Sequence, residues 1–457
     1  MGLINFPAAL RIVALAGILL ADLAYSIDLD INDEQSIKAA ASTTTYAMMT
    51  YYKGNESGQI PGAFPTKWWE GSTLFLALLQ YWHFTGDTTY NDELRVGLEW
   101  QAGDDDYMPS NYSSFLGNDD QMFWGLAAMT AAELQFADAT DVGSGYSWLS
   151  LAQGVFNSQI KRWDNTSCHG GMRWQIWEWE SGYTMKNAIS NGGLFQLSAR
   201  LARYTHQAIY SQWAEKIWYW SLSTPLISNS TWHVADSTSA IHHCDDQGDT
   251  QWTYNYGTYM MGAAYMYNYT NGSTVWLDAV NGLLTKTFDT FLSNNILEEI
   301  TCEPTEQCND NDILFKGLLS SWLSFTALLV PSTYNKIMPV LKASAQAAAK
   351  SCTGHNNNTC GVRWYLSTYD GWIGMEEQIS ATNIFVANMI AFDRSAPVTA
   401  YTGGDSTSNP SAGETNSSDT NPKESPITAA DKAGAIMLTI AFVGGWIGIM
   451  GFILMGS

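Results

Sequence analysis

Positive charge is scarce in this sequence of 457 residues, which has 21 Lys and Arg against 44 Asp and Glu and a net charge of -23. A protein that binds nucleic acid neutralises phosphates with Lys and Arg, so this composition excludes nucleic acid as an expected partner. Alternating runs of β-branched residues long enough to form strands are also few, which argues against a β-rich fold.

Basic residues are also missing after the last apolar stretch, which covers 433–455 and is followed by only two residues. A membrane-spanning helix normally keeps Lys or Arg on its cytoplasmic side, whereas a GPI signal ends in its apolar tail and is removed whole. We therefore expect a GPI-attachment signal at 417–457, with Asn416 as the attachment residue and Ser417 or Gly413 as alternatives. A transmembrane tail that is not cleaved is the competing interpretation.

The N-terminal region has the order of a secretory signal peptide: Arg11, an apolar run at 12–20 and a small-residue site at 24–26. We expect residues 1–26 to be removed and the rest to reach the outer face of the plasma membrane and the cell wall, held to the membrane by the GPI lipid. Eight Asn-x-Ser/Thr sequons agree with this luminal route; they are at Asn55, Asn111, Asn165, Asn229, Asn268, Asn271, Asn357 and Asn416.

The six cysteines form an even set, as is usual for disulfides in an oxidising compartment. Six cysteines allow 15 pairings, and a preference for short loops favours Cys302 with Cys308, Cys352 with Cys360, and then Cys168 with Cys244. A zinc site is the alternative, but the sequence contains no Cys-x-x-Cys pair. We expect no metal and no cofactor.

Aromatic residues are abundant, with 20 Trp and 23 Tyr. Sugar rings present apolar C–H faces that pack on aromatic planes, while their hydroxyl groups need nearby polar side chains. Carbohydrate is therefore the expected ligand class.

Helical periodicity dominates the chain between 32 and 393, with breaks at Gly and Asn. Six segments are apolar on nearly every face, as buried helices are; they begin near Trp69, Asp120, Asn191, Asn255, Phe315 and Glu377. Six others are amphipathic and cover 34–52, 88–101, 145–161, 207–222, 274–291 and 334–350. This pattern predicts an all-α fold, an (α/α)6 barrel of six inner and six outer helices in one domain, with an irregular helical bundle as the alternative.

Domain limits follow from composition. The barrel is expected over 27–398 as the catalytic domain, and the Ser/Thr-rich segment 399–416 is expected to form a stalk because it offers little to bury.

The most unusual motif places two carboxyl groups, Asp119 and Asp120, at the start of a helix that is otherwise apolar. The helix N-terminus favours an ionised carboxylate, so Asp119 could stay charged as a nucleophile, while apolar neighbours could keep a proton on Asp120. A retaining glycosidase needs this division between two carboxyl groups roughly 5 to 5.5 Å apart. The alternative is that Asn118 and Asp119 only cap the helix.

A second acidic cluster at 244–249 contains Asp246, for which we favour binding of sugar hydroxyl groups. A magnesium-diphosphate site is the alternative, but no basic clamp accompanies the cluster. Other substrate-binding candidates share a position at the start of an inner helix: Trp69, Glu70, Asn191, Asn255 and Tyr256. The acidic pair Asp310 and Asp312 is interpreted as part of a solvated loop.

At these residues the chain resembles glycoside hydrolase family 76, in particular its fungal GPI-anchored members similar to endo-α-1,6-mannosidases. The resemblance spans 28–393 and is carried by the block 118–121 (Asn-Asp-Asp-Gln) and by 252–255 (Trp-Thr-Tyr-Asn).

The resemblance implies an (α/α)6 barrel without a metal and a retaining mechanism, with Asp119 as nucleophile and Asp120 as acid/base. It also implies action on α-1,6-mannose-containing glycans, such as mannan or the GPI-anchor glycan of mannoproteins, with transfer to cell-wall β-glucan as acceptor. A mannan-binding wall protein without catalytic activity is the alternative.

Overall fold

The computed structural model describes residues 26–64, 67–139, 145–355, 358–414 and 439. The chain divides into two units, 1–414 and 415–457, and the elements below all belong to the first. The expected signal peptide up to residue 25, the GPI signal, Asn357 and Asn416 lie outside the described residues.

Twelve α-helices make up the described part of the first unit. The inner helices are α3 (Trp68–Thr85), α5 (Asn118–Glu133), α7 (Ala188–Thr205), α9 (Thr253–Tyr269), α11 (Asp310–Leu329) and α13 (Met375–Ala387). The outer helices are α2 (Glu34–Tyr51), α4 (Asn91–Trp100), α6 (Trp148–Lys161), α8 (Ala208–Leu222), α10 (Thr274–Phe291) and α12 (Tyr334–Ser351).

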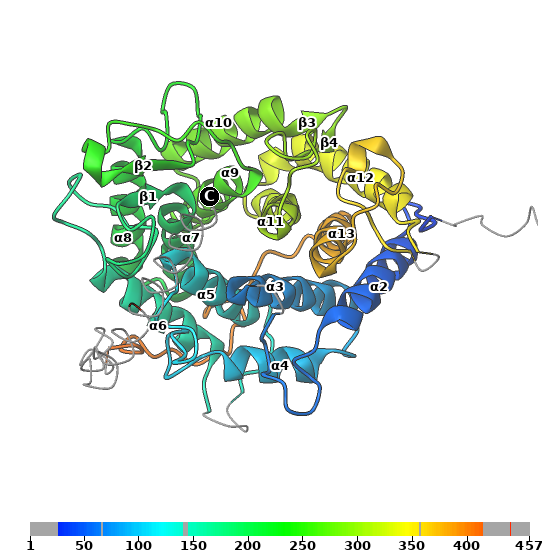
Figure 1. Ribbon diagram of the computed structural model, residues 1–457, viewed down its shortest axis with the longest axis horizontal. Helices are drawn as coiled ribbons and strands as arrows, with labels where there is room; N and C mark the ends of the chain where they lie inside the picture. Colours follow the sequence, from blue (N-terminus) through cyan, green and yellow to red (C-terminus); the bar gives the residue numbers. More distant parts are fainter. Residues whose placement is uncertain (1–25, 65–66, 140–144, 356–357, 415–438, 440–457) are drawn as a thin grey trace, which may run out of the picture. The chain divides into compact units, whose positions relative to one another are not determined.

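The inner helices form a closed ring, in which each contacts the next and α13 returns to α3 (Figure 1). The outer helices surround this ring, with α4 on α3, α6 on α5, α8 on α7, α10 on α9, and both α12 and α2 on α13. The predicted (α/α)6 barrel is confirmed, as are the inner and outer assignments of all twelve helices.

Burial explains why the two sets of helices differ in sequence. Every residue of α5 except Asp120 is buried, whereas the outer helix α4 buries only Leu94, Gly97 and Leu98. An apolar stripe is enough for a helix with one wet face, but an inner helix has no wet face. Helix α11 is for this reason long and apolar enough to cross a membrane by composition, yet it is almost wholly buried inside the barrel.

A buried ion pair ties three inner helices together. The Glu133 carboxylate of α5 accepts from Arg200 Nη2 of α7 at 2.6 Å and from the Tyr265 hydroxyl of α9 at 2.9 Å. The same guanidinium nitrogen donates to the Thr130 hydroxyl at 2.7 Å. A buried pair is stable only when hydrogen bonds offset its desolvation, and this one has them.

Strands are short and lie in the loops between helices. Strand β1 (Met185–Asn187) pairs antiparallel with β2 (Ser237–Ser239), so that Asn187 faces Ser237 across the ladder. Strand β3 (Leu292–Ser293) pairs with β4 (Ile296–Leu297). Single-turn 3-10 helices occur at Ala240–His242, Pro331–Thr333, Trp364–Leu366 and Asn388–Ala391. Strand β1 leads directly into the inner helix α7, and β2 lies in the connection between α8 and α9.

Three disulfides close loops at the helix connections. Cys168 is joined to Cys244, which links the loop after α6 to the loop after β2, and the other bonds are Cys302–Cys308 and Cys352–Cys360. This is the pairing that the preference for short loops selected.

The segment 399–414, expected to be a stalk, instead packs along the outer helix α6, and we call it the C-terminal strap. It begins where Ala400 N donates to Tyr204 O at the end of α7, and it then follows α6 from Ser147 to Lys161. Asn157 Nδ2 donates to Pro410 O and Ala412 O, both at 2.8 Å, and Ala412 is buried. Composition missed this contact because polar helix residues hold the strap by its backbone.

Sequon asparagines are accessible wherever the structure describes them. The exposed residues are Asn55, Asn111, Asn165, Asn229, Asn268 and Asn271. Glycans at these positions would meet solvent and not the core.

Replacing one member of the buried ion pair should be strongly destabilising. We expect Glu133→Ala to lower the free energy of unfolding by about 3 to 5 kcal/mol, because the Arg200 charge then stays buried without its partner. Urea unfolding followed by circular dichroism measures this loss. The double variant Glu133→Leu with Arg200→Met should lose less stability than Glu133→Ala alone. If its loss equalled the sum of the losses in Glu133→Leu and Arg200→Met, Glu133 and Arg200 would not stabilise each other as a pair.

Candidate active site

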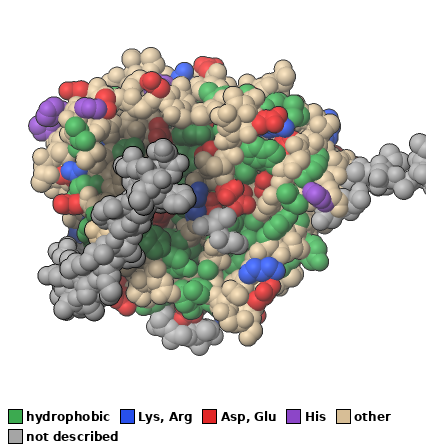
Figure 2. Space-filling view, viewed as in Figure 1, with side chains coloured by type: hydrophobic (Ala, Val, Ile, Leu, Met, Phe, Trp, Pro, Cys, Tyr) green, Lys and Arg blue, Asp and Glu red, His purple; other side chains and the backbone are tan. Residues whose placement is uncertain are grey.

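A cavity of about 840 Å³ lies at the end of the barrel where α3, α5 and α11 begin. Figure 2 shows hydrophobic and acidic side chains gathered around a hollow in one face of the molecule. Among the described residues of the cavity wall are four carboxyl groups (Asp119, Asp120, Asp236 and Asp312), one cation (Lys67), and ten aromatic side chains: Phe64, Trp68, Trp69, Tyr112, Phe115, Phe123, Trp174, Trp252, Tyr254 and Phe315.

The two adjacent carboxyl groups lie at the first turn of α5, where backbone N–H groups have no partner within the helix. The Asp120 carboxylate accepts from the backbone N–H of Gly117 at 2.6 Å, and Asp119 Oδ1 accepts from the N–H of Asp120 at 3.0 Å. Asp120 therefore has the capping role that was the alternative interpretation of Asn118 and Asp119, and it lines the cavity as well.

Asn118 anchors this turn to the rest of the protein. Its amide donates to Arg173 O at 3.0 Å, its backbone N–H donates to Trp174 O at 2.8 Å, and its side-chain oxygen accepts from Arg162 Nε at 2.7 Å. The position of the carboxyl pair is thus set by two loops as well as by α5.

Burial raises the pKa of both carboxyl groups. The pKa of Asp119 is raised well above its ordinary value, first by burial and then by the neighbouring Asp120, although the Asn187 hydrogen bond lowers it. Burial raises the pKa of Asp120 to about 6, opposed by the Gly117 N–H and by the charge of Lys67. Burial thus disfavours the ionised form of both groups, and the charge of each group disfavours ionisation of the other.

The sequence led us to expect that Asp119 remains ionised and that Asp120 keeps the proton. Burial acts against the ionised form of both groups, because Asp119 is only 9% exposed and Asp120 is only partly exposed. The favourable field of the helix N-terminus does not outweigh the burial of Asp119.

Asn187 of β1 holds the deeper carboxyl group, since its Nδ2 donates to Asp119 Oδ2 at 3.1 Å. Successive side chains of a strand point to opposite faces. Met185 and Asn187 line the cavity accordingly, while the Lys186 side chain between them is buried on the other face of the strand.

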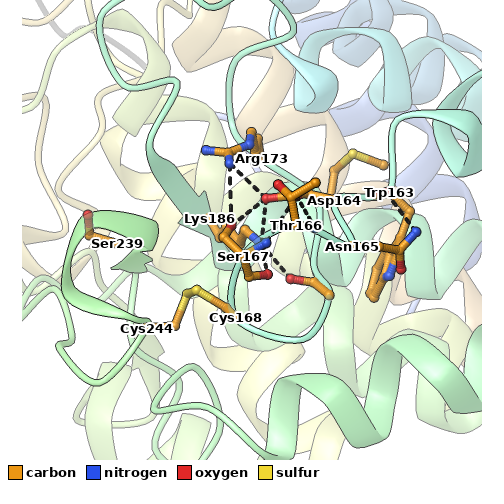
Figure 3. Close-up of polar contacts among 12 residues, drawn as sticks. Trp163, Asp164, Asn165, Thr166, Ser167, Cys168, Arg173, Lys186, Ser239 and Cys244 are labelled. Carbon is orange, nitrogen blue, oxygen red and sulfur yellow. Dashed lines mark hydrogen bonds and ion pairs between the residues drawn. A yellow bond between two sulfur atoms is a disulfide. The ribbon is translucent and has the colours of Figure 1, made fainter.

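A charged network on that other face fixes the strand. In Figure 3 the Asp164 carboxylate lies between Arg173 and Lys186, with the Cys168–Cys244 disulfide alongside. Asp164 Oδ2 is 2.8 Å from Arg173 Nη2 and 3.0 Å from Lys186 Nζ. Burial raises the pKa of Asp164, but hydrogen bonds from Ser167, Thr166 and Lys186 together hold the pKa well below its usual range. Asp164 is therefore held as a carboxylate beside Arg173 and Lys186, and these contacts fix the strand from which Asn187 reaches Asp119.

Two further acidic residues of the wall, Asp236 and Asp312, were not predicted as site residues from the sequence. Asp312 is 7% exposed and accepts from the N–H of Asn309 at 3.0 Å at the start of α11, so the expectation of a solvated loop was wrong. Asp236 accepts from Asn255 Nδ2 at 3.0 Å. Burial raises the pKa of both groups. The signal that was available is Asn309-x-x-Asp312, which places a carboxyl group at the third position of an inner helix as Gly117-x-x-Asp120 does.

Of the six predicted substrate-binding residues, Trp69 lies in the cavity wall, where it packs on Phe123 at 4.8 Å between ring centroids and donates to Asn311 at 3.0 Å. The other five do not line the cavity. Glu70, Asn191, Asn255 and Tyr256 lie at the expected end of their helices but face the packing between elements, and Asp246 lies in a loop.

Four of these five are buried: Glu70, Asn191, Asn255 and Tyr256. The Asn191 amide bonds with both backbone groups of Met172, and the Tyr256 hydroxyl donates to Gln251 at 2.7 Å. Asp246 instead caps the β2 turn, accepting from Ser239 N at 2.8 Å and pairing with His242. Asn255 supports Asp236 from behind.

No group of three His, Cys, Asp or Glu residues in the described part of the chain is arranged to hold a metal ion. The chemistry that the cavity can perform with its own groups is proton transfer and nucleophilic attack by carboxyl groups. Its aromatic walls suit the apolar faces of a sugar ring.

Comparison with known proteins gives consistent results for most of the chain. The family model described as Glycosyl hydrolase family 76 matches residues 36–401. The chain is 43% identical over 435 residues to "Mannan endo-1,6-alpha-mannosidase DCW1" of Saccharomyces cerevisiae, covering 94% of this chain and 96% of that protein. It is 38% identical over 424 residues to "Mannan endo-1,6-alpha-mannosidase DFG5" of Candida albicans, covering 91% and 92%.

Solved structures agree. Dfg5 from Chaetomium thermophilum in complex with glucosamine has a TM-score of 0.81 at 38% identity and covers 84% of this chain and 97% of that one. An inactive variant of an α-1,6-mannanase from Salegentibacter sp. HEL1_6, in complex with α-1,6-mannotriose, has a TM-score of 0.63 at 18% identity and covers 78% and 99%. At 18% identity, the similarity to the Salegentibacter mannanase shows a common fold and no more.

Removing the cation of the wall should change the titration of the carboxyl pair. Lys67 lowers the pKa of Asp120, so we expect Lys67→Met to raise that pKa. Carbon-13 NMR titration of Asp-labelled protein would measure it. The control Lys53→Met removes an exposed lysine that pairs with Glu56 outside the wall, and it should leave the pair unchanged. An equal titration in Lys67→Met and the unmodified protein would contradict the electrostatic role of Lys67.

Proposed function

Because the chain belongs to glycosyl hydrolase family 76, and is a glycosidase, we propose that it cleaves α-1,6-linked mannose with retention of configuration, using Asp119 and Asp120. The observation that carries this proposal is the pair of adjacent carboxyl groups in the wall of an aromatic cavity, where burial raises the pKa of both. A protein that only binds mannan would gain nothing from burying two adjacent carboxyl groups, which costs stability.

In the first step, Asp120 donates a proton to the oxygen of the scissile bond while Asp119 attacks the anomeric carbon. The C–O bond to the leaving group breaks, and a covalent glycosyl ester forms on Asp119. In the second step, Asp120 removes a proton from water or from a sugar hydroxyl, whose oxygen attacks the anomeric carbon. The bond between that carbon and the Asp119 oxygen breaks, and Asp119 leaves as a carboxylate.

Asp119 must be ionised to attack, although burial raises its pKa. The positive charge that develops on the sugar ring stabilises the carboxylate at that moment. Hydrogen bonds from Asn187 and from the Asp120 N–H stabilise the same charged form. The proton of the pair then belongs to Asp120, which faces the leaving oxygen.

The composition of the wall supports a neutral or amine-bearing glycan as substrate. Four carboxyl groups and Lys67 give the described wall an acidic balance, which disfavours anionic sugars and favours an amine. The relatives named above are mannan endo-1,6-α-mannosidases, and the similar Dfg5 structure contains glucosamine. A GPI-anchor glycan, which joins mannose to glucosamine, is therefore the donor that we favour.

Transfer to a sugar acceptor fits the second step as well as hydrolysis does. Ten aromatic side chains line the cavity, so a sugar ring packs there better than bulk water does. We propose that β-glucan of the cell wall is the acceptor, and that the enzyme thereby joins mannoproteins to the wall.

We also propose that the enzyme acts in the secretory pathway and at the cell surface, held by a GPI anchor at Asn416. Three disulfides and six exposed sequon asparagines in the described residues support an oxidising, luminal route.

Asp119→Asn should lower turnover of α-mannosides by about 10⁴-fold or more, because no other group can form the glycosyl ester. Intact mass after reaction with a fluoro-sugar donor of α-mannose configuration tests this directly. One added mannosyl unit on Asp119 is expected in the unmodified enzyme and none in Asp119→Asn. The control Asp245→Asn alters an exposed carboxylate outside the cavity and should label normally. An adduct on another residue would exclude Asp119 as nucleophile.

Asp120→Ala should reduce the rate on natural glycans by about 10²- to 10⁴-fold, which is the usual contribution of acid assistance. On aryl mannosides with good leaving groups, the first step needs no proton, so its rate should fall far less. Burst-phase kinetics with both substrates separate the two steps. If the first step slowed equally on both, Asp120 would not be the acid.

A further inference from the structure

The loop 174–184 between α6 and α7 carries two stacked tryptophans, Trp177 and Trp179, and its first residues line the cavity. The Trp179 side chain is 61% exposed and stacks on Trp177, with 4° between the ring planes and 5.2 Å between the ring centroids. Trp177 is buried. One face of the Trp179 indole is thus open to solvent, while the other face packs on the buried Trp177.

The loop that carries the pair is held by its own hydrogen bonds. Backbone N–H groups of Glu180, Tyr183 and Met185 donate to carbonyls three residues earlier, at 3.1, 3.1 and 2.9 Å. Gly182 has a φ of +95°, and a Cβ there would lie 2.3 Å from the Trp174 ring. The loop therefore presents Trp179 in one orientation.

The loop of the two tryptophans borders the catalytic cavity. Trp177 Nε1 donates to Ser113 O at 2.7 Å, which joins it to the loop that carries Phe115. Phe115 lines the cavity and is 53% exposed. Trp174 and Gln175, at the start of the loop 174–184, also line the cavity. Trp179 therefore belongs to a segment that forms part of the cavity wall.

The chemistry of the loop selects a neutral glycan. Residues 174–184 contain Glu178 and Glu180 but no Lys or Arg. A tryptophan face packs on the C–H face of a hexose, and carboxylates accept from its hydroxyl groups. The two carboxylates repel phosphorylated or acidic glycans.

We propose that Trp179, supported by Trp177, is a binding subsite for the outer mannose units of a chain whose inner unit lies at Asp119. This inference rests on the proposed function, because the occupant is the remainder of the same glycan. The subsite makes the enzyme prefer long chains over short ones, and it plays no part in the bond-breaking steps.

The test compares the full-length enzyme with Trp179→Ala, Trp179→Phe and Tyr219→Ala. Tyr219 is a matched control, because it is an aromatic residue of α8 that is 55% exposed and does not line the cavity. Calorimetry measures binding of α-1,6-mannohexaose, α-1,6-mannobiose and a β-1,3-glucan hexasaccharide, and kcat/KM is measured with an aryl mannoside.

Trp179→Ala should weaken binding of mannohexaose by about three- to tenfold, the size expected for the loss of one aromatic stack. Binding of mannobiose and turnover of the aryl mannoside should stay within about twofold of the unmodified enzyme. Trp179→Phe should restore most of the affinity, and Tyr219→Ala should behave as the unmodified enzyme does.

Unchanged mannohexaose affinity in Trp179→Ala would overturn the subsite while leaving the proposed function intact. A selective loss of the β-glucan hexasaccharide would show that the occupant is the acceptor and not the mannose chain. If the unmodified enzyme neither turned over nor bound any mannoside, the proposed function itself would fail.

Discussion

Six helices packed into a closed ring leave no side on which a polar group can meet water, and this constraint decides where chemistry can occur. All of α5 is buried apart from Asp120 in its first turn. Polar groups on such helices either pair with each other, as Glu133 and Arg200 do, or gather at helix ends. The cavity lies at one of these ends, because only there do backbone N–H groups remain to hold carboxyl groups in place.

Burial makes the carboxyl pair less stable as anions, and it also raises the pKa of both groups. Desolvation disfavours a charge on Asp119, and its nearest neighbour is another acid. The protein offsets this cost with donors of fixed position, such as Asn187, and keeps that residue in place through the charged network of Asp164, Arg173 and Lys186. Burial disfavours the charged form of Asp119, and positive charge on a sugar ring beside it would stabilise that form.

Periodicity was a reliable guide to the barrel because inner and outer helices differ in the number of faces that they bury. The motif that contains Asp119 and Asp120 was also visible, since an acidic pair is conspicuous in an apolar helix. The rest of the wall was harder to predict. Asn191 and Tyr256 begin inner helices just as Trp69 does, yet they face protein, because a difference of one position turns a side chain by about 100°. Asn187 lies in the short strand β1, and Asp236 directly precedes β2. The path of both segments depends on the β1–β2 pairing and on the Cys168–Cys244 disulfide, which leave no periodic signal in the sequence.

The C-terminal strap has a mechanical consequence. It starts beside the closed ends of α5 and α7 and runs parallel to α6, finishing where Gly413 bonds to Lys161 and Asp105, near the first turn of α5. Since α6 has 14 residues, this path is roughly 20 Å long at ~1.5 Å per residue. A force applied to the chain at residue 414 would act on the open end of the barrel and not on its base. The hydrogen bonds between the strap and α6 would bear that force one after another, from Lys161 back to Ser147.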